Sequence, residues 1–341
     1  MGGMSKRASL FPIGRGASWG IRMRTIKACA LALGLLAAAF GPSLAQEPCK
    51  LGSDALGVSR TAEIDTSAGP RFGFQYNEQS ILADGEVVLT FDDGPLRAYT
   101  KPVLEALSAH CTKATFFLVG RMAVADPEMV QEYARRGHTV GSHTWSHANL
   151  QALTPLKARA EIELGFSAVQ AALGKPLTPF FRFPYLRDGQ SIMTYLQGRQ
   201  VAMFSIDIDS KDYRTHDASS VQRKVMGDLA RMRKGIVLFH DIQRSTAHAL
   251  PGLLAELKAK SYRIVHLQPK ASLATSPEYD ALAQQELAKR RIVVGGQPLA
   301  KRALTWPLAE PTVPAEPAAT KGRNLPRPRA NAEDWPTTIW R

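Results

Sequence analysis

From residue 86 onward the chain alternates short apolar runs with amphipathic stretches, and this alternation limits the fold more than any other feature of the sequence. The apolar runs are nearly continuous and rich in Val, Ile and Phe, as is typical of strands that are buried on both faces of a parallel sheet. We expect seven strands, at residues 86–91, 114–119, 138–143, 180–185, 201–207, 235–240 and 262–267.

Helical patterns separate these runs. The clearest one starts after Thr154, an N-cap residue followed by Pro155 at the first helical position, and stops at Gly174. Other helices are expected near residues 101–110, 127–136, 188–198, 219–232, 246–260 and 277–291. Strands that alternate with helices form βα units, so the sequence predicts an α/β fold, a closed or nearly closed barrel of about seven parallel strands. A doubly wound open sheet is the alternative, because periodicity alone does not show closure.

The composition is that of a globular protein. Of 341 residues, 45% are hydrophobic and 21% are charged, which excludes a disordered, collagen-like or disulfide-framework protein. The formal net charge is +13, but residues 1–45 hold six Lys or Arg and no Asp or Glu. The basic residues of the middle of the chain form no run or stripe, so we expect no nucleic-acid partner.

The first 45 residues have the pattern of a secretory signal peptide. Residues 28–40 form an apolar run behind basic residues, Gly41-Pro42 interrupts it, and small residues precede Gln46. The run is shorter than the roughly 20 residues that a membrane-spanning helix needs. We therefore expect a processed protein that is exported to the periplasm or beyond, with no stable membrane span. A retained membrane anchor is the alternative.

The other segments differ from the barrel in composition. Residues 46–82 are weakly patterned and are expected to form an arm packed on a barrel domain at residues 83–270. Residues 271–304 predict a helical extension, and residues 305–341, rich in Pro and Ala, predict a disordered tail. Cys49 and Cys111 are the cysteines left after processing. An even pair in an oxidising compartment favours a disulfide, with two unrelated buried thiols as the alternative.

Polar clusters follow the predicted strands at the end where barrel enzymes place their chemistry. The first strand is followed by Asp92-Asp93-Gly94. This is either an acidic turn or a pair of carboxylates, of which one binds a metal and the other takes a proton. The third strand ends in His143 and His147, and two imidazoles four residues apart can converge on one cation if the segment turns helically.

Three further clusters have weaker signals. Arg182 interrupts an apolar aromatic run, and burial of an arginine is costly without a carboxylate partner. His240 closes an apolar strand, where a lone histidine is more often a core residue. Asp209 and Asp212 follow the fifth strand, with Tyr213 after them. Each signal alone is weak, but their joint occurrence in this order is a strong indication of a site.

In this order, the segments 90–94, 143–147, 182–185, 209–213 and 238–240 resemble the five motifs of the polysaccharide deacetylases, the NodB-homology domains of carbohydrate esterase family 4. The resemblance covers about half of the chain, residues 86–267. It implies a distorted (β/α) barrel and makes residues 83–270 the catalytic domain. One departure is Tyr213, where the family usually has tryptophan; it bears on one wall of the substrate groove and not on the metal.

The resemblance also implies a role for each polar residue. Asp93, His143 and His147 would hold one divalent metal, zinc, with cobalt or nickel as alternatives. Asp92 would take a proton from the attacking water, and Arg182 would keep this carboxylate ionised by a charge-assisted hydrogen bond.

The remaining roles concern the substrate. The backbone N–H of Tyr185 would stabilise the oxyanion, and His240 would protonate the departing amine. A carboxylate would raise the pKa of His240, with Asp212 preferred over Asp209. The residues implied to contact the substrate are Tyr185, Tyr213 and Leu238.

The expected function is therefore that of an exported metal-dependent hydrolase, which removes N-acetyl groups from a glycan and releases acetate. Peptidoglycan is preferred over a chitooligosaccharide because an exported protein meets it first and a basic surface suits an anionic envelope. The alternatives are an O-deacetylase of acetylated xylan or exopolysaccharide, and a catalytically silent glycan-binding relative.

Overall fold

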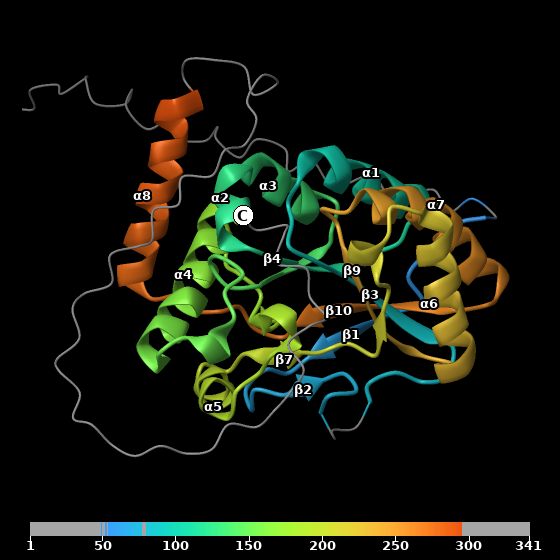
Figure 1. Ribbon diagram of the computed structural model, residues 1–341, viewed down its shortest axis with the longest axis horizontal. Helices are drawn as coiled ribbons and strands as arrows, with labels where there is room; N and C mark the ends of the chain where they lie inside the picture. Colours follow the sequence, from blue (N-terminus) through green and yellow to red (C-terminus); the bar gives the residue numbers. More distant parts are fainter. Residues whose placement is uncertain (1–48, 50–51, 53, 77–79, 295–341) are drawn as a thin grey trace, which may run out of the picture. The chain divides into compact units, whose positions relative to one another are not determined.

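The computed structural model describes residues 49, 52, 54–76 and 80–294 (Figure 1). The expected signal peptide at residues 1–45 and the expected tail at residues 305–341 lie outside the described residues. Among the helices of the described part, none combines the length and the apolar character needed to cross a bilayer.

The centre of the fold is a ring of parallel strands (Figure 1). These strands are β3 (Glu86–Asp92), β4 (Thr115–Leu118), β5 (Thr139–Ser142), β6 (Phe180–Phe181), β7 (Ala202–Phe204), β8 (Ile208–Asp209) and β9 (Gly235–His240). Strands β3 to β7 pair in succession, while β3 also pairs with β9, and β9 pairs with β8. Because β7 and β8 lie on one stretch of chain, residues 202–209 link the two ends of this series. The predicted α/β fold is confirmed, as a distorted barrel.

The segment expected as an arm contains two strands that sequence patterning does not predict. β1 (Arg60–Ile64) pairs in parallel with β10 (Arg263–Pro269), which in turn pairs with β3. β2 (Arg71–Phe72) pairs in parallel with β7. Sequence patterning does not predict the short strand β8 either, so the sheet of the described residues has ten strands rather than about seven.

Helices cover the ring on its outer side. They are α1 (Arg97–Ala109), α2 (Gly120–Ala125), α3 (Pro127–Arg135), α4 (Pro155–Leu173), α5 (Gln190–Gly198), α6 (Ala218–Met232) and α7 (Arg244–Ala259). A further helix, α8 (Pro277–Val294), packs on α2 and α4 instead. As predicted, α4 is capped by the Thr154 hydroxyl, which accepts from the Lys157 N–H, and it ends at Gly174 in the left-handed conformation. The short helix α2 was not predicted.

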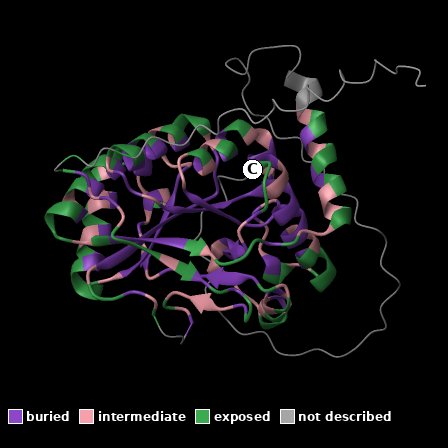
Figure 2. Ribbon diagram, turned by 180° about the vertical axis from the view of Figure 1, so that it is seen from behind, coloured by how far each residue is buried: buried purple, intermediate pink, exposed green. Residues whose placement is uncertain are grey.

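Successive side chains of β3 point to opposite faces of the sheet and belong to two different apolar clusters. Val87, Leu89 and Phe91 belong to the large apolar cluster that includes the helices, whereas Val88 belongs to a second cluster with side chains from the other strands. Figure 2 shows the strands of the ring almost wholly buried, β1 and β2 much less so, and the helices exposed along their outer faces. Since side chains alternate, Thr90 and Asp92 share the face of Val88. β3 therefore directs Asp92 to the inside of the ring at its carboxyl end.

A disulfide joins Cys49 to Cys111, with 5.6 Å between the Cα atoms. The predicted pairing is present, and it ties the chain before β1 to the end of α1.

Replacement of both cysteines by serine tests the contribution of this bond to stability. The bond closes a loop of 62 residues, and the chain-entropy relation predicts that its loss lowers the free energy of unfolding by roughly 4 kcal/mol. Urea denaturation of the double variant and of the oxidised parent measures the difference. An unchanged free energy of unfolding would contradict the prediction.

Candidate active site

Asp93, His143 and His147 meet at the carboxyl ends of β3 and β5. One oxygen or nitrogen atom of each side chain lies within 4.8 Å of those of the other two. The Nε2 atoms of His143 and His147 are 3.6 and 3.5 Å from Asp93 Oδ1, and all three residues are buried. The structure thus brings together the three residues that the sequence proposes as metal ligands.

The donor set suits a divalent cation. Burial raises the pKa of Asp93 to about 7, and its Oδ1 accepts no hydrogen bond from the described residues. Burial lowers the pKa of His143 to about 3, so this imidazole is neutral. Its Nδ1 donates to the carbonyl oxygen of Arg182 at 2.7 Å, which leaves the Nε2 lone pair directed at the cluster. A buried carboxylate oxygen without a donor and neutral imidazoles are ligands that zinc and similar ions accept.

The backbone at these residues adopts conformations that non-glycine residues rarely take. φ is 77° at Asp93, 69° at Thr144 and 60° at His147. Such conformations cost free energy and persist where the surrounding structure fixes them, often at functional sites. They turn the two segments sharply just beyond their strands, so that the side chains face one another.

Asp92 is held by a fully buried arginine. Arg182 Nη1 donates to Asp92 Oδ1 and to the Thr90 hydroxyl, both at 2.8 Å. Its Nε and Nη2 donate to the carbonyl oxygens of Phe204 and Ser205 at 3.3 and 3.1 Å. Burial raises the pKa of Asp92, and the Arg182 guanidinium opposes that shift. The buried arginine therefore has the carboxylate partner that its burial requires.

His240, at the end of β9, is bound by Asp212. Its Nδ1 lies 2.8 Å from Asp212 Oδ1, and its backbone N–H donates to Oδ2 at 2.6 Å. Burial alone would lower the pKa of His240, but the carboxylates of Asp212, Asp93 and Asp92 together outweigh this effect and raise the pKa to about 10. Asp209 instead accepts a hydrogen bond from the Tyr213 hydroxyl at 3.1 Å. The contact to His240 thus comes from Asp212, which was predicted in preference to Asp209.

The expected substrate contacts occupy three different environments. The ring of Tyr185 lies edge-on to that of His147, with 4.5 Å between centroids, and the ring of Tyr213 lies 5.5 Å from that of His240. Leu238 is fully buried in β9, two residues before His240 and therefore on the same face. The contact between Leu238 and a substrate stays a prediction.

One buried residue at this end of the ring received no role from the sequence. Asp241 Oδ2 accepts hydrogen bonds from the Tyr133 hydroxyl and, at 2.7 Å, from the Thr100 hydroxyl. A Cβ on Gly94 would meet both carboxylate oxygens of Asp241 and would lie 2.6 Å from the Tyr133 hydroxyl. The only sequence signals were the glycine after the acidic pair and the acidic residue after His240.

Comparison with known proteins gives a consistent result. A family model described as polysaccharide deacetylase matches residues 81–201. The peptidoglycan-N-acetylglucosamine deacetylase of Listeria monocytogenes is 35% identical over 181 residues, which are 52% of this chain and 37% of that protein. The chitooligosaccharide deacetylase of a Bradyrhizobium species is 31% identical over 173 residues, which are 50% of this chain and 78% of that protein. The solved structure of a Bdellovibrio bacteriovorus peptidoglycan deacetylase is similar with a TM-score of 0.59 and 34% identity, over 64% of this chain and 61% of that one.

Gly94→Ala tests the close approach of the Asp241 carboxylate. The carboxylate could move away from the added Cβ only by breaking its hydrogen bonds with Thr100 and Tyr133. We therefore expect the free energy of unfolding to fall by about 1–3 kcal/mol. The control is Gly227→Ala in α6, where an added Cβ meets nothing within 4 Å and should stabilise the helix slightly. Equal effects of the two substitutions in urea denaturation would show that the Asp241 carboxylate does not restrict residue 94.

Proposed function

Because the chain belongs to the polysaccharide deacetylase family, we propose that it is a metal-dependent hydrolase that removes N-acetyl groups from an acetylated glycan and releases acetate. The observation that carries this proposal is the buried Asp93, His143 and His147 cluster beside the Asp92–Arg182 pair. The relatives named above act on peptidoglycan or chitooligosaccharides, so we propose a glycan that contains N-acetylglucosamine, with peptidoglycan first. The signal-like N-terminus and the disulfide support export.

Asp93, His143 and His147 would hold one divalent ion, zinc, with cobalt or nickel as alternatives. When bound, such an ion supplies a Lewis acid that polarises the acetamide carbonyl and acidifies water.

Asp92 acts as the general base. Its Oδ1 is occupied by Arg182, while its Oδ2 lies 3.8 Å from His143 Nε2 and therefore borders the metal-ligand cluster. The attacking water gives its proton to Oδ2 as the new C–O bond forms. Burial raises the pKa of this carboxyl, and the guanidinium opposes that shift and so favours the ionised form that a base needs.

His240 acts as the general acid. Asp212 occupies its Nδ1 and keeps the ring protonated, so the proton that leaves comes from Nε2 and passes to the departing glucosamine nitrogen. The backbone N–H of Tyr185 stabilises the negative charge that develops on the carbonyl oxygen. A residue for each role is present, which disfavours a catalytically silent relative.

Acetate release tests the proposed function directly. The chelated protein should release no acetate from peptidoglycan or N-acetylated chitooligosaccharides, and addition of zinc or cobalt should restore release. Acetylated xylan serves as the O-acetyl comparison. Glycan binding that is unaffected by chelation, with no acetate from any of these substrates, would contradict the proposal.

Two substitutions separate the base from a metal ligand. Asp92→Asn should keep the metal and lower kcat by about 10²–10⁴-fold, because the base is lost. His147→Ala should lower the bound metal content sharply, because a ligand is lost. Asp228→Asn on α6, a carboxylate paired with Lys224 and Arg231, is the matched control. Metal loss in Asp92→Asn with normal metal in His147→Ala would show that the two roles are wrongly assigned.

The pH profile tests the pairing of His240 with Asp212. A raised pKa keeps His240 in its acid form up to high pH, and activity is lost as the pH rises through that pKa. Of the carboxylates that raise it, Asp212 contributes most, and Asp212→Asn removes that contribution, so the alkaline limb of the kcat profile should move to lower pH by at least about one unit. Asp209→Asn should leave the position of this limb unchanged. An unmoved limb in Asp212→Asn would contradict the assignment.

A further inference from the structure

A segment that precedes the family match contacts the loop that carries Tyr185. This segment, residues 71–76, is called the strap here, and it comprises β2 and the four residues after it. Its backbone follows residues 203–206: β2 pairs with β7, and the Phe74 N–H donates to the Ile206 carbonyl at 3.1 Å. Gly73 has a φ of +105°, and a Cβ there would lie 2.7 Å from the Ser205 carbonyl carbon. The strap therefore packs tightly against the segment that links β7 to β8.

Gln75 on the strap uses both ends of its side-chain amide. Its Nε2 donates to the carbonyl oxygen of Leu186 at 3.0 Å, and its Oε1 accepts from the Ser205 hydroxyl at 2.8 Å. These two residues lie on different elements, the turn after β6 and the segment after β7. Gln75 thus bridges two segments that come together at the carboxyl end of the ring.

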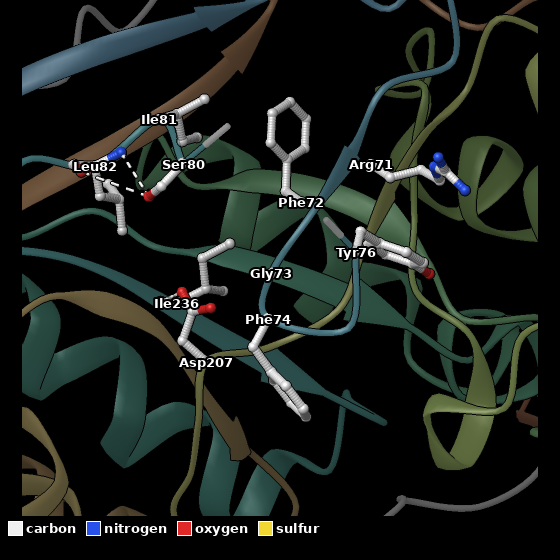
Figure 3. Close-up of a pocket in the computed structure, with 10 residues that line it drawn as sticks. All are labelled: Arg71, Phe72, Gly73, Phe74, Tyr76, Ser80, Ile81, Leu82, Asp207 and Ile236. Atoms are coloured by element: carbon white, nitrogen blue, oxygen red, sulfur yellow. Dashed lines mark hydrogen bonds between the residues drawn. The ribbon is translucent and has the colours of Figure 1, made fainter. Parts of the chain in front are cut away.

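The next residue of the strap contacts the same loop. Tyr76 is buried, and its hydroxyl donates to the Asp188 carboxylate. Figure 3 shows the side chains of Arg71 and Tyr76 together on one side of the strap, with Phe74 pointing away from them, and Arg71 lies 5.4 Å from the Tyr76 ring centroid. The strap therefore holds the loop at two points, Leu186 and Asp188, just after Tyr185.

The loop needs such support because its backbone is strained. Tyr185 and Leu186 have φ values of 58° and 53°, two consecutive non-glycine residues in the left-handed region. The turn around them has two local hydrogen bonds, from the Leu186 N–H to the Phe183 carbonyl and from the Arg187 N–H to the Pro184 carbonyl, both at 3.1 Å. A strained turn keeps its geometry only where neighbouring structure fixes it.

The bridge continues to the general base. The Ser205 carbonyl accepts from Arg182 Nη2, and Arg182 Nη1 donates to Asp92. Contacts thus run from Asp92 through Arg182, Ser205 and Gln75 to the turn that carries Tyr185.

We propose that Gln75 is a positioning residue for deacetylation: it fixes the turn at Tyr185, and with it the Tyr185 backbone N–H, relative to the Asp92–Arg182 pair. This proposal rests on the proposed function. It extends the catalytic unit to the strap, before the residues that match the family model. A positioning role acts on the developing oxyanion, so its loss lowers kcat and leaves KM and metal content nearly unchanged.

The test uses Gln75→Ala in the full chain. We expect kcat for acetate release to fall at least tenfold, KM to stay within threefold and zinc content to match the parent. Gln131→Ala is the matched control, because Gln131 Nε2 also donates to a backbone carbonyl, that of Ala172, but in the contact of α3 with α4. Ser205→Ala completes a double-mutant cycle: the combined variant should be no worse than Gln75→Ala, because both changes break one bridge.

Amide hydrogen exchange supplies a readout that does not depend on activity. In Gln75→Ala, exchange of residues 185–188 should quicken at least tenfold, while residues 139–147 stay as in the parent. If the parent releases no acetate but exchange of residues 185–188 quickens in Gln75→Ala, then Gln75 does hold this loop and the proposed function is wrong. If the parent is active and Gln75→Ala matches Gln131→Ala in kcat and exchange, the positioning role is overturned. A kcat loss accompanied by zinc loss and additive effects in the cycle would also overturn it.

Discussion

The buried ion pair of Arg182 and Asp92 is the interaction on which the rest of this end of the ring depends. Two opposite charges leave water together, and removal of either would leave the other uncompensated. The Arg182 side chain donates to four acceptors, two on β3 and two at the end of β7, the carbonyl oxygens of Phe204 and Ser205. It therefore joins strands that are far apart in the sequence. Its backbone carbonyl also accepts from His143 Nδ1. One residue thus holds the proposed base with its side chain and orients a proposed metal ligand with its main chain.

The sequence was sufficient for elements whose signals are local. Caps set the ends of α4, and continuous apolar runs marked β3 and β9 because both faces of those strands are buried. β1 and β2 escaped prediction for the opposite reason: β1 has a single buried residue, Ile64, and β2 has two residues in all. They are strands only because β10 and β7 offer them partners, and such pairing is not visible in a local pattern.

Some residues of the candidate site could be predicted from the sequence, and others could not. The order of polar residues at strand ends was enough to nominate Asp93, His143 and His147, since parallel strands bring their carboxyl ends together. The preference for Asp212 over Asp209 rested on the resemblance alone, because both follow the same predicted strand, and only the coordinates supply the contact with His240. Gln75 carried no signal: it is a neutral amide in a weakly patterned segment, 111 positions before its partner Leu186.

Asp93, His143 and His147 are proposed to share one divalent ion at the mouth of the ring. Anomalous diffraction from a crystal of the zinc-loaded protein, measured above and below the zinc absorption edge, shows whether the ion lies there. We expect a single anomalous peak about 2.0–2.2 Å from Asp93 Oδ1 and from the Nε2 atoms of His143 and His147. No peak among these atoms at full zinc occupancy in solution, or a peak held by other residues, would contradict the proposal.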